Sequence, residues 1–162
     1  MHLNLGAGTY LLDGHDNLDS QPYAGVTVVR RVPPLPYEDA TVESIFAGHF
    51  VEHVPPHDLA PLFAECMRVL HPGGTLTVIV PDADIARHLM LHADLLPYHY
   101  ALAVQGEVYD DMPHYTIWNQ QRLAQALQDA GFTLRPDYRW QEDWRVADRR
   151  VPWQAGAQGV KP

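Results

Sequence analysis

The sequence has little cysteine, no long apolar run and no excess of basic charge. Its one cysteine, Cys66, has no second cysteine to pair with, so an intramolecular disulfide is excluded, and its place in an apolar stripe indicates a buried core residue. The longest strongly apolar run, residues 76–80, is too short to cross a bilayer, and no basic and apolar leader opens the sequence. We therefore expect a cytoplasmic protein without a membrane segment.

Acidic residues outnumber basic ones. The formal net charge of −9 repels a phosphate backbone, so we expect no nucleic-acid partner. Five of the eleven basic residues lie between residues 135 and 150, where four acidic residues nearly balance them. We interpret this stretch as solvated and salt-bridged, with a phosphate-binding patch as the alternative.

Short apolar segments alternate with helical patterns along the 162 residues. This order predicts one α/β domain, Rossmann-like, with a mostly parallel sheet and helices on both faces. We place the domain at residues 1–150 and interpret residues 151–162, rich in glycine, alanine and glutamine, as a weakly ordered C-terminal tail. The expected strands are residues 2–5, 15–18, 26–29, 43–47, 75–80 and 132–139.

Two helices are expected. In residues 59–70 apolar side chains recur at the spacing of one helical face, Asp58 precedes them as a cap, and Pro-Gly-Gly at 72–74 follows as a stop. A second helix is expected at residues 117–130, with Thr116 as its cap.

The first predicted strand runs directly into a glycine turn, Gly6-Ala7-Gly8, and Asp19 ends the next strand. Glycines allow a sharp turn and close approach to a ligand, and a carboxylate at this place can accept hydrogen bonds from a ribose diol. Alone, the pattern is equally consistent with a plain tight turn.

Four sequence blocks, in this order, resemble the class I S-adenosylmethionine-dependent methyltransferases, in particular small bacterial and phage members. They are residues 3–8 (LNLGAG) with 17–19 (NLD), 34–39 (PLPYED), 45–53 (IFAGHFVEH) and 68–82 (RVLHPGGTLTVIVPD). A looser match, residues 114–132, extends the resemblance over residues 2–132. The resemblance implies S-adenosylmethionine as cofactor and an enzyme of the EC 2.1.1 class, and we expect a small-molecule methyl acceptor.

The resemblance also implies the cofactor contacts, position by position. Gly6, Ala7 and Gly8 would line the methionine and ribose part, and Asp19 would accept the ribose hydroxyls. The segment 35–37 would border the adenine and His49 the methyl sulfonium. The full set of implied contacts is Gly6, Ala7, Gly8, Asp19, Leu35, Tyr37 and His49.

The sequence departs from the family pattern at three places. Arg30 and Arg31 stand where many members have an acidic residue for the adenine amino group, so that contact is open. The connection between the first two strands is too short for a full helix, and no helical extension precedes the first strand, so the domain is compact or truncated at its N-terminus. The aromatic stretch 98–118 is the candidate cover over the site.

Methyl transfer from a sulfonium is an in-line displacement, so alignment of the nucleophile is the main requirement. A base is needed only for acceptors that lose a proton, and the candidates are His49, Asp82 and His114. For His49, a hydrogen-bonding role at the strand end is the alternative. Glu52 and His53 are assigned a structural role, because the same segment must start the next helix.

Two other functions compete with methyl transfer. Residues 49–53 spell H-x-x-E-H, the signature of inverted zinc peptidases. The motif follows an extended strand and stops at Pro55-Pro56, whereas a zinc site requires a long helix, so no metal site is expected. The third function is a non-catalytic domain that binds S-adenosylmethionine or a partner. The sequence does not indicate an oligomeric state.

Overall fold

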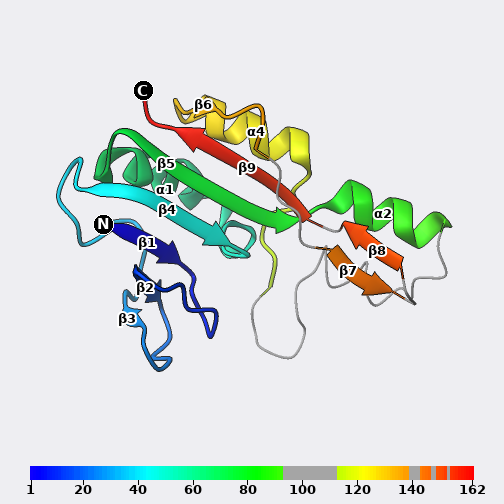
Figure 1. Ribbon diagram of the computed structural model, residues 1–162, viewed down its shortest axis with the longest axis horizontal. Coiled ribbons are helices and arrows are strands. Elements are labelled where there is room, and N and C mark those ends of the chain that lie inside the picture. Colours follow the sequence, from blue (N-terminus) through cyan, green and yellow to red (C-terminus); the bar gives the residue numbers. More distant parts are fainter. Residues whose placement is uncertain (93–112, 139–142, 147–148, 153) are drawn as a thin grey trace.

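The computed structural model describes residues 1–92, 113–138, 143–146, 149–152 and 154–162. Seven strands form one sheet in the order β3-β2-β1-β4-β5-β9-β6 (Figure 1). Strands β1 to β5 pair in parallel, whereas β9 lies antiparallel between β5 and β6. The strands are β1 (His2–Leu5), β2 (His15–Asp19), β3 (Thr27–Val28), β4 (Val42–Gly48), β5 (Leu70–Pro81), β6 (Thr133–Leu134) and β9 (Gln154–Val160). The predicted mostly parallel α/β sheet is confirmed.

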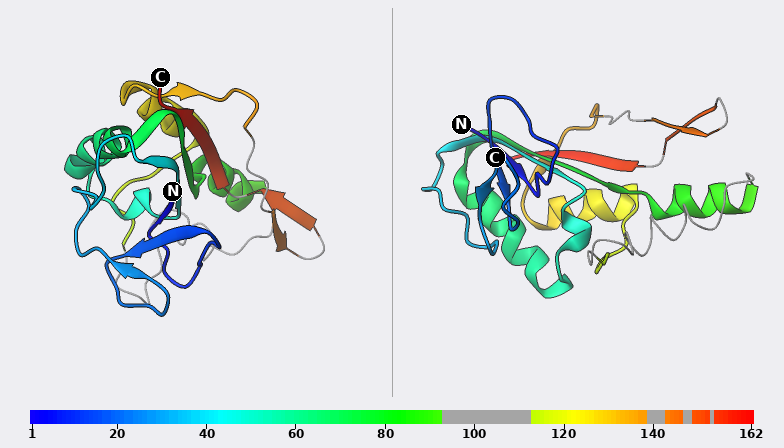
Figure 2. Two further views of the ribbon diagram at one scale, coloured as in Figure 1. Left: turned by 60° about the vertical axis from the view of Figure 1, so that its left-hand side comes forward. Right: turned by 90° about the horizontal axis from the view of Figure 1, so that it is seen from below.

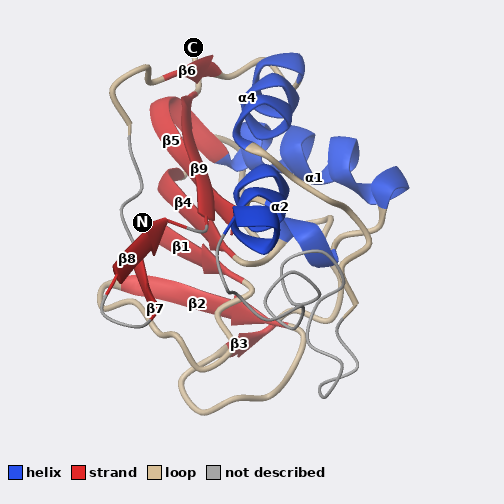
Figure 3. Ribbon diagram, turned by 90° about the vertical axis from the view of Figure 1, so that its right-hand side faces the viewer, coloured by secondary structure: helices blue, strands red, loops and turns tan. Residues whose placement is uncertain are grey.

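The helices of the described residues lie on one face of the sheet (Figures 2 and 3). They are the 3-10 turn η1 (Val51–His53), α1 (Pro56–Val69), α2 (Ala83–His92) and α4 (Gln120–Asp129). Among the described residues, the connections from β1 to β4 contain turns and prolines but no helix, so the helices described here cover one of the two faces on which helices were expected. A separate hairpin pairs β7 (Asp143–Val146) with β8 (Arg149–Pro152).

The two faces of the sheet differ in polarity because side chains alternate along each strand. Leu3 and Leu5 point to the helical face and belong to a core that includes Cys66 of α1 and Leu123 of α4. Burial raises the pKa of the Cys66 thiol to about 12, as befits a core residue. None of the helices in the described ranges has the length and apolarity that a bilayer-spanning segment requires.

The opposite face carries polar side chains that hydrogen-bond across neighbouring strands. Asn4 Nδ2 donates to Asn17 Oδ1 at 2.8 Å, His2 Nδ1 lies 2.8 Å from the Ser44 hydroxyl, and Gln158 Nε2 donates to Thr77 Oγ1 at 2.7 Å. These hydrogen bonds satisfy polar groups whose burial without a partner would be unfavourable. Asn4, for example, is only 2% exposed. These polar pairs distinguish this face from the apolar face that the described helices cover.

The predicted boundaries of the first helix are wrong at both ends. Helix α1 begins at Pro56 with Pro55 as N-cap, because proline is tolerated in the first turn, and Asp58 lies inside that turn. The helix ends at Val69 because Leu70 is extended, so the Pro-Gly-Gly segment lies within β5 instead of stopping the helix. Gly73 has a φ of 81°, and its N–H donates to the carbonyl of Lys161 at 2.9 Å.

The second helix also starts later than predicted. Asn119 is the N-cap of α4 and accepts a hydrogen bond from the N–H of Arg122 at 2.8 Å. Asparagine is at least as good a cap as threonine, so it displaces the expected Thr116. Thr116 is buried and contacts the turn η1.

The prediction of a weakly ordered tail at residues 151–162 is wrong over residues 154–160, which form a strand. Residues 154–160 form β9, whose register with β5 runs from Gln154 opposite Pro81 to Val160 opposite Thr75. Its glycines and alanines are required by tight packing: a Cβ at Gly159 would lie 2.7 Å from the Cβ of Phe132. The strand predicted at 132–139 is reduced to the two residues of β6, and residue 139 lies outside the described residues.

Candidate cofactor site

A cavity of about 410 Å³ opens beside the carboxyl ends of β1, β2 and β4. Gly6 and Gly8 after β1, Asp19 at the end of β2 and His49 after β4 all line it. Ligands of open parallel sheets bind at this edge, and the volume is within the range of about 300–1,000 Å³ typical of small-molecule pockets. The structure thus brings together four of the residues to which the resemblance assigned cofactor contacts.

The glycine turn has the backbone geometry that the sequence indicated. Gly6 has a φ of 66° and Gly8 a φ of 51°, a region that favours glycine. A Cβ at Gly6 would lie 2.5 Å from Cδ2 of Phe50, whereas a Cβ at Gly8 would meet nothing within 4 Å. Gly6 therefore fits the fold, and Gly8 leaves open space beside the cavity. Ala7 is buried and does not line the cavity.

Asp19 is held in place by backbone donors. Its Oδ2 accepts from the N–H of Gly8 at 2.8 Å, and its Oδ1 accepts from the N–H of Gln21 at 2.9 Å. A carboxylate offers about four acceptor positions, so an oriented Asp19 retains capacity for a hydroxyl donor. The hydrogen bond between Gly8 and Asp19 also links the two parts of the predicted motif directly.

Gly6→Ala is expected to destabilise the fold more than Gly14→Ala does. Both glycines have positive φ values, 66° and 73°, but only the Cβ at Gly6 meets a side chain. Strain plus overpacking costs about 2–4 kcal/mol at Gly6, against about 1 kcal/mol for the conformational term at Gly14. Urea unfolding of both variants measures the difference, and equal losses would contradict the predicted contact with Phe50.

The segment expected to border the adenine is anchored to α1 instead. Leu35 and Tyr37 do not line the cavity, and at this place its wall is formed by residues 29–32, which include Arg30 and Arg31. The hydroxyl of Tyr37 donates to Asp16, and burial, followed by this hydrogen bond and the charge of Asp16, raises the pKa of Tyr37. Leu35 and Tyr37 thus lie behind the wall of this cavity, and the cofactor contacts assigned to them stay a prediction.

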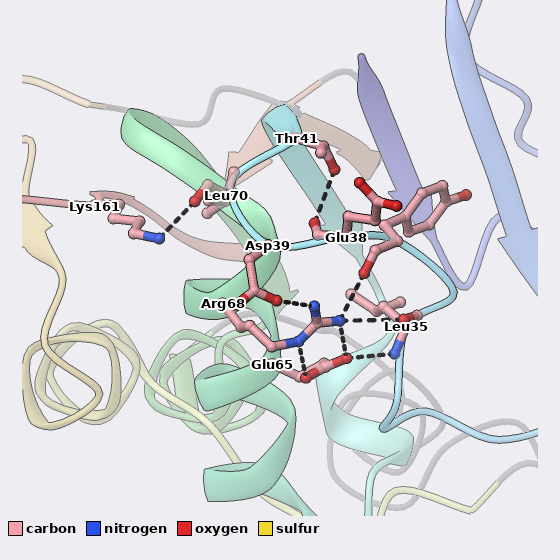
Figure 4. Close-up of polar contacts among 9 residues, drawn as sticks. Leu35, Glu38, Asp39, Thr41, Glu65, Arg68, Leu70 and Lys161 are labelled. Carbon is pink, nitrogen blue, oxygen red and sulfur yellow. Dashed lines mark hydrogen bonds and ion pairs between the residues drawn. The ribbon is translucent and has the colours of Figure 1, made fainter.

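Arg68 of α1 fixes this segment (Figure 4). Its Nη2 donates to the carbonyl of Tyr37 at 2.9 Å and to Glu65 Oε1 at 2.7 Å, and its Nη1 donates to Asp39. Glu65 Oε1 in turn accepts from the N–H of Leu35 at 2.7 Å. The network holds the connection between β3 and β4, whose earlier part lines the cavity.

The stability that Glu65 provides is expected to depend on pH. Hydrogen bonds from Arg68, and then from Leu35, hold the pKa of Glu65 below its usual 4.5 against the opposing effect of burial. A depressed carboxyl pKa stabilises the fold above about pH 4.5, and this contribution is lost as the pH falls through the folded value. Glu65→Gln should cost about 1 kcal/mol at neutral pH, and the difference should shrink in acid. Urea unfolding from pH 7 to pH 3 measures it; a constant difference would contradict the assignment.

His49 adopts a strained backbone at the cavity. Its φ is 53°, uncommon for a residue with a side chain, and its N–H donates to the carbonyl of Ile79 at 2.9 Å. Nδ1 donates to Oε1 of Glu52 at 3.1 Å, and Nε2 contacts the side-chain amide of Gln154. Backbone strain of this kind concentrates at functional positions.

The other two candidate bases lie elsewhere. Asp82 does not line the cavity, and its Oδ1 accepts from the N–H groups of Asp84 and Ile85 at 2.9 and 3.2 Å, so it caps α2. In the sequence, an aspartate just before a helical segment indicates such an N-cap role. His114 is not a lining residue either, but its ring lies edge-on to that of His53 with centroids 4.8 Å apart. His53 itself lines the cavity.

The zinc-peptidase alternative lacks its structural requirement. His49 precedes the 3-10 turn η1, so the motif at residues 49–53 does not lie on one helical face. The candidate cover at 98–118 falls largely outside the described residues; of its described part, Tyr115 lines the cavity.

The strand order and the position of the cavity define a Rossmann-like methyltransferase fold, and solved structures share it. A S-adenosylmethionine-dependent methyltransferase from Methanosarcina mazei is 16% identical, with a TM-score of 0.66 over 99% of this chain and 91% of that one. The Burkholderia thailandensis 1,6-didemethyltoxoflavin-N1-methyltransferase, solved with 1,6-didemethyltoxoflavin and S-adenosylhomocysteine, is 16% identical, with a TM-score of 0.61 over 99% and 70%. An Aquifex aeolicus enzyme of this class is 16% identical, with a TM-score of 0.54 over 99% and 81%.

The sequence agrees with the fold. The sequence model of the family described as Methyltransferase domain matches residues 13–78. No curated protein matches the chain. The resemblance to class I S-adenosylmethionine-dependent methyltransferases is thereby confirmed, and fold and family match together support S-adenosylmethionine as the cofactor.

Proposed function

We propose that this chain transfers the methyl group of S-adenosylmethionine to a small-molecule acceptor. The observation that carries the proposal is the pairing of an open glycine turn with an oriented carboxylate at the cavity: Gly8 leaves space for a ligand, and its N–H holds Asp19 in position. Asp19 would accept the ribose hydroxyls, and the turn would border the methionine part. The bound cofactor supplies an electrophilic methyl group.

His49 is the residue we assign to the acceptor's proton. With Nδ1 donating to the buried carboxylate of Glu52, Nε2 is the acceptor nitrogen of the ring. The side-chain amide of Gln154 contacts Nε2, so this amide must move away before Nε2 can take the acceptor's proton. Glu52 then acts as a positioning residue that fixes the tautomer and ring orientation of His49. Asp82 is not proposed as a base because its carboxylate caps α2.

Binding and turnover test the proposal separately. Calorimetry with S-adenosylhomocysteine should show one site per chain, and labelled S-adenosylmethionine should transfer its methyl group to a member of a panel of small hydroxyl and amine acceptors. His49→Gln should keep the binding and lower turnover at least about a hundredfold, since general-base catalysis contributes about 10²–10⁴. His57→Gln, at a side chain 80% exposed on α1, is the control and should change neither.

Two outcomes would overturn the proposal. Absence of S-adenosylhomocysteine binding would remove the cofactor assignment. Binding without turnover over the whole panel would favour the non-catalytic cofactor-binding domain instead.

A further inference from the structure

Three side chains with metal-binding atoms meet at the edge of the cavity. Glu52 and His53 belong to η1, and His114 precedes α4, more than sixty residues later in the chain. One ligand atom from each residue lies within 4.8 Å of those from the other two. Two imidazoles and one carboxylate form a common donor set for zinc and related divalent transition metals.

The carboxylate of Glu52 supplies an independent indication of a ligand. The residue is 1% exposed, and Oε1 accepts from His49. Among the described residues, Oε2 is the buried side-chain oxygen or nitrogen that has no hydrogen-bond partner. Buried carboxylate oxygens are normally hydrogen-bonded or bound to a cation. A cation between Oε2 and the two imidazoles would satisfy it.

The protein backbone holds the three residues together without a metal. The carbonyl of Glu52 accepts from the N–H groups of Tyr115 and Thr116 at 2.8 and 3.2 Å. The hydroxyl of Thr116 also accepts from the indole N–H of buried Trp118 at 2.8 Å. These bonds dock the segment that carries His114 onto η1, so the ligand set is preorganised.

The Nδ1 atom of His53 has the kind of hydrogen-bond partner that is typical of a metal-binding histidine. Nδ1 lies 3.3 Å from the carbonyl of Pro113, to which it can donate, and this leaves Nε2 as the ligand atom. A histidine ligand almost always donates its other ring N–H to a carbonyl, a carboxylate or water, which fixes the tautomer. The contact between Glu52 and His49 orients the carboxylate in a similar way.

We propose that Glu52, His53 and His114 bind one divalent transition-metal ion of the zinc type. The site differs from the peptidase motif, because His49 contacts the other carboxylate oxygen and is not a ligand. Three protein ligands leave one position of a four-coordinate ion for water or for an oxygen of a bound molecule. Because His53, Pro113 and Tyr115 line the cavity, the ion would border it. The proposal does not depend on methyl transfer.

Metal titration of the untagged 162-residue chain tests the site without cofactor or acceptor. After treatment with a chelator, Zn²⁺ should bind at one equivalent per chain by calorimetry, and Co²⁺ should give the visible absorption of a tetrahedral complex. His53→Ala and His114→Ala should each weaken Zn²⁺ binding by at least about tenfold. Even mutation of a residue that only hydrogen-bonds to a metal ligand typically lowers metal affinity about 10–100-fold. Glu52→Gln should do the same.

The controls separate this site from other histidines. His71→Ala removes a partly exposed histidine whose Nδ1 lies against the carbonyl of Pro72, and the double variant His88→Ala/His92→Ala removes two histidines spaced four residues apart, as on one helical face. Both should bind Zn²⁺ as the wild type does. Urea unfolding midpoints measured in the presence of a chelator verify that the His53 and His114 variants fold. The test therefore stands on these two variants even if Glu52→Gln, at a buried position, fails to fold. No stoichiometric binding, or binding unchanged in both His53→Ala and His114→Ala, would overturn it.

Discussion

Asp19→Ala is expected to weaken S-adenosylhomocysteine binding about ten- to hundredfold. The variant removes the charged acceptor proposed for the ribose hydroxyls, and hydrogen bonds to a charged group contribute about 1.5–3 kcal/mol. It also releases the N–H of Gly8, which Asp19 Oδ2 holds at 2.8 Å, so the glycine turn loses a tie to β2. Calorimetric titration of the folded variant gives the ratio of dissociation constants.

Two further variants separate charge from geometry. Asp13→Ala removes the same charge from the exposed loop between β1 and β2, and should bind S-adenosylhomocysteine like the wild type. Asp19→Asn keeps an acceptor oxygen but loses the charge, so its affinity should fall between those of the wild type and Asp19→Ala. If Asp19→Ala and Asp13→Ala bind equally well, the ribose contact is wrong.

Deletion of residues 154–162 is expected to abolish folding. The deletion removes β9, which lies between β5 and β6 and buries Ala155 and Ala157. It also removes Lys161, whose ammonium donates to the carbonyl of Leu70 at 2.6 Å. The free energy of unfolding of a domain is only about 5–15 kcal/mol. We expect removal of a strand from within the sheet to cost more free energy than that.

Circular dichroism and urea unfolding measure this effect. The deleted chain should show no cooperative transition, whereas deletion of Pro162 alone, an exposed residue beyond β9, should leave the transition in place. A cooperative transition in the chain that lacks 154–162 would show that residues 1–153 fold by themselves, in agreement with the domain predicted at residues 1–150.

Local patterns were sufficient for the strands that carry the site. β1, β2 and β4 were placed within a few residues, because apolar alternation and the glycine turn are local signals. β9 was missed because its glycines and alanines are typical of loops, and only the packing of Gly159 against Phe132 explains them. Burial of small residues in a sheet depends on the neighbouring strand, which the sequence alone does not reveal.

The site was predicted in part for the same reason. Gly6, Gly8, Asp19 and His49 lie at or just after strand ends that the sequence marks, and they meet at the cavity. Contacts between distant segments had no local signal, so the approach of His114 to His53 was not foreseen.

The polar face of the sheet has a consequence for strand alignment. A shift of β1 by one residue would turn Asn4 toward the leucines beneath α1 and would expose Leu3 and Leu5 on the face opposite the helices. In a parallel sheet buried on both sides, runs of valine and isoleucine would tolerate such slippage more readily. The hydrogen-bonded pairs Asn4–Asn17 and His2–Ser44 therefore favour the native strand register and make shifted registers less stable.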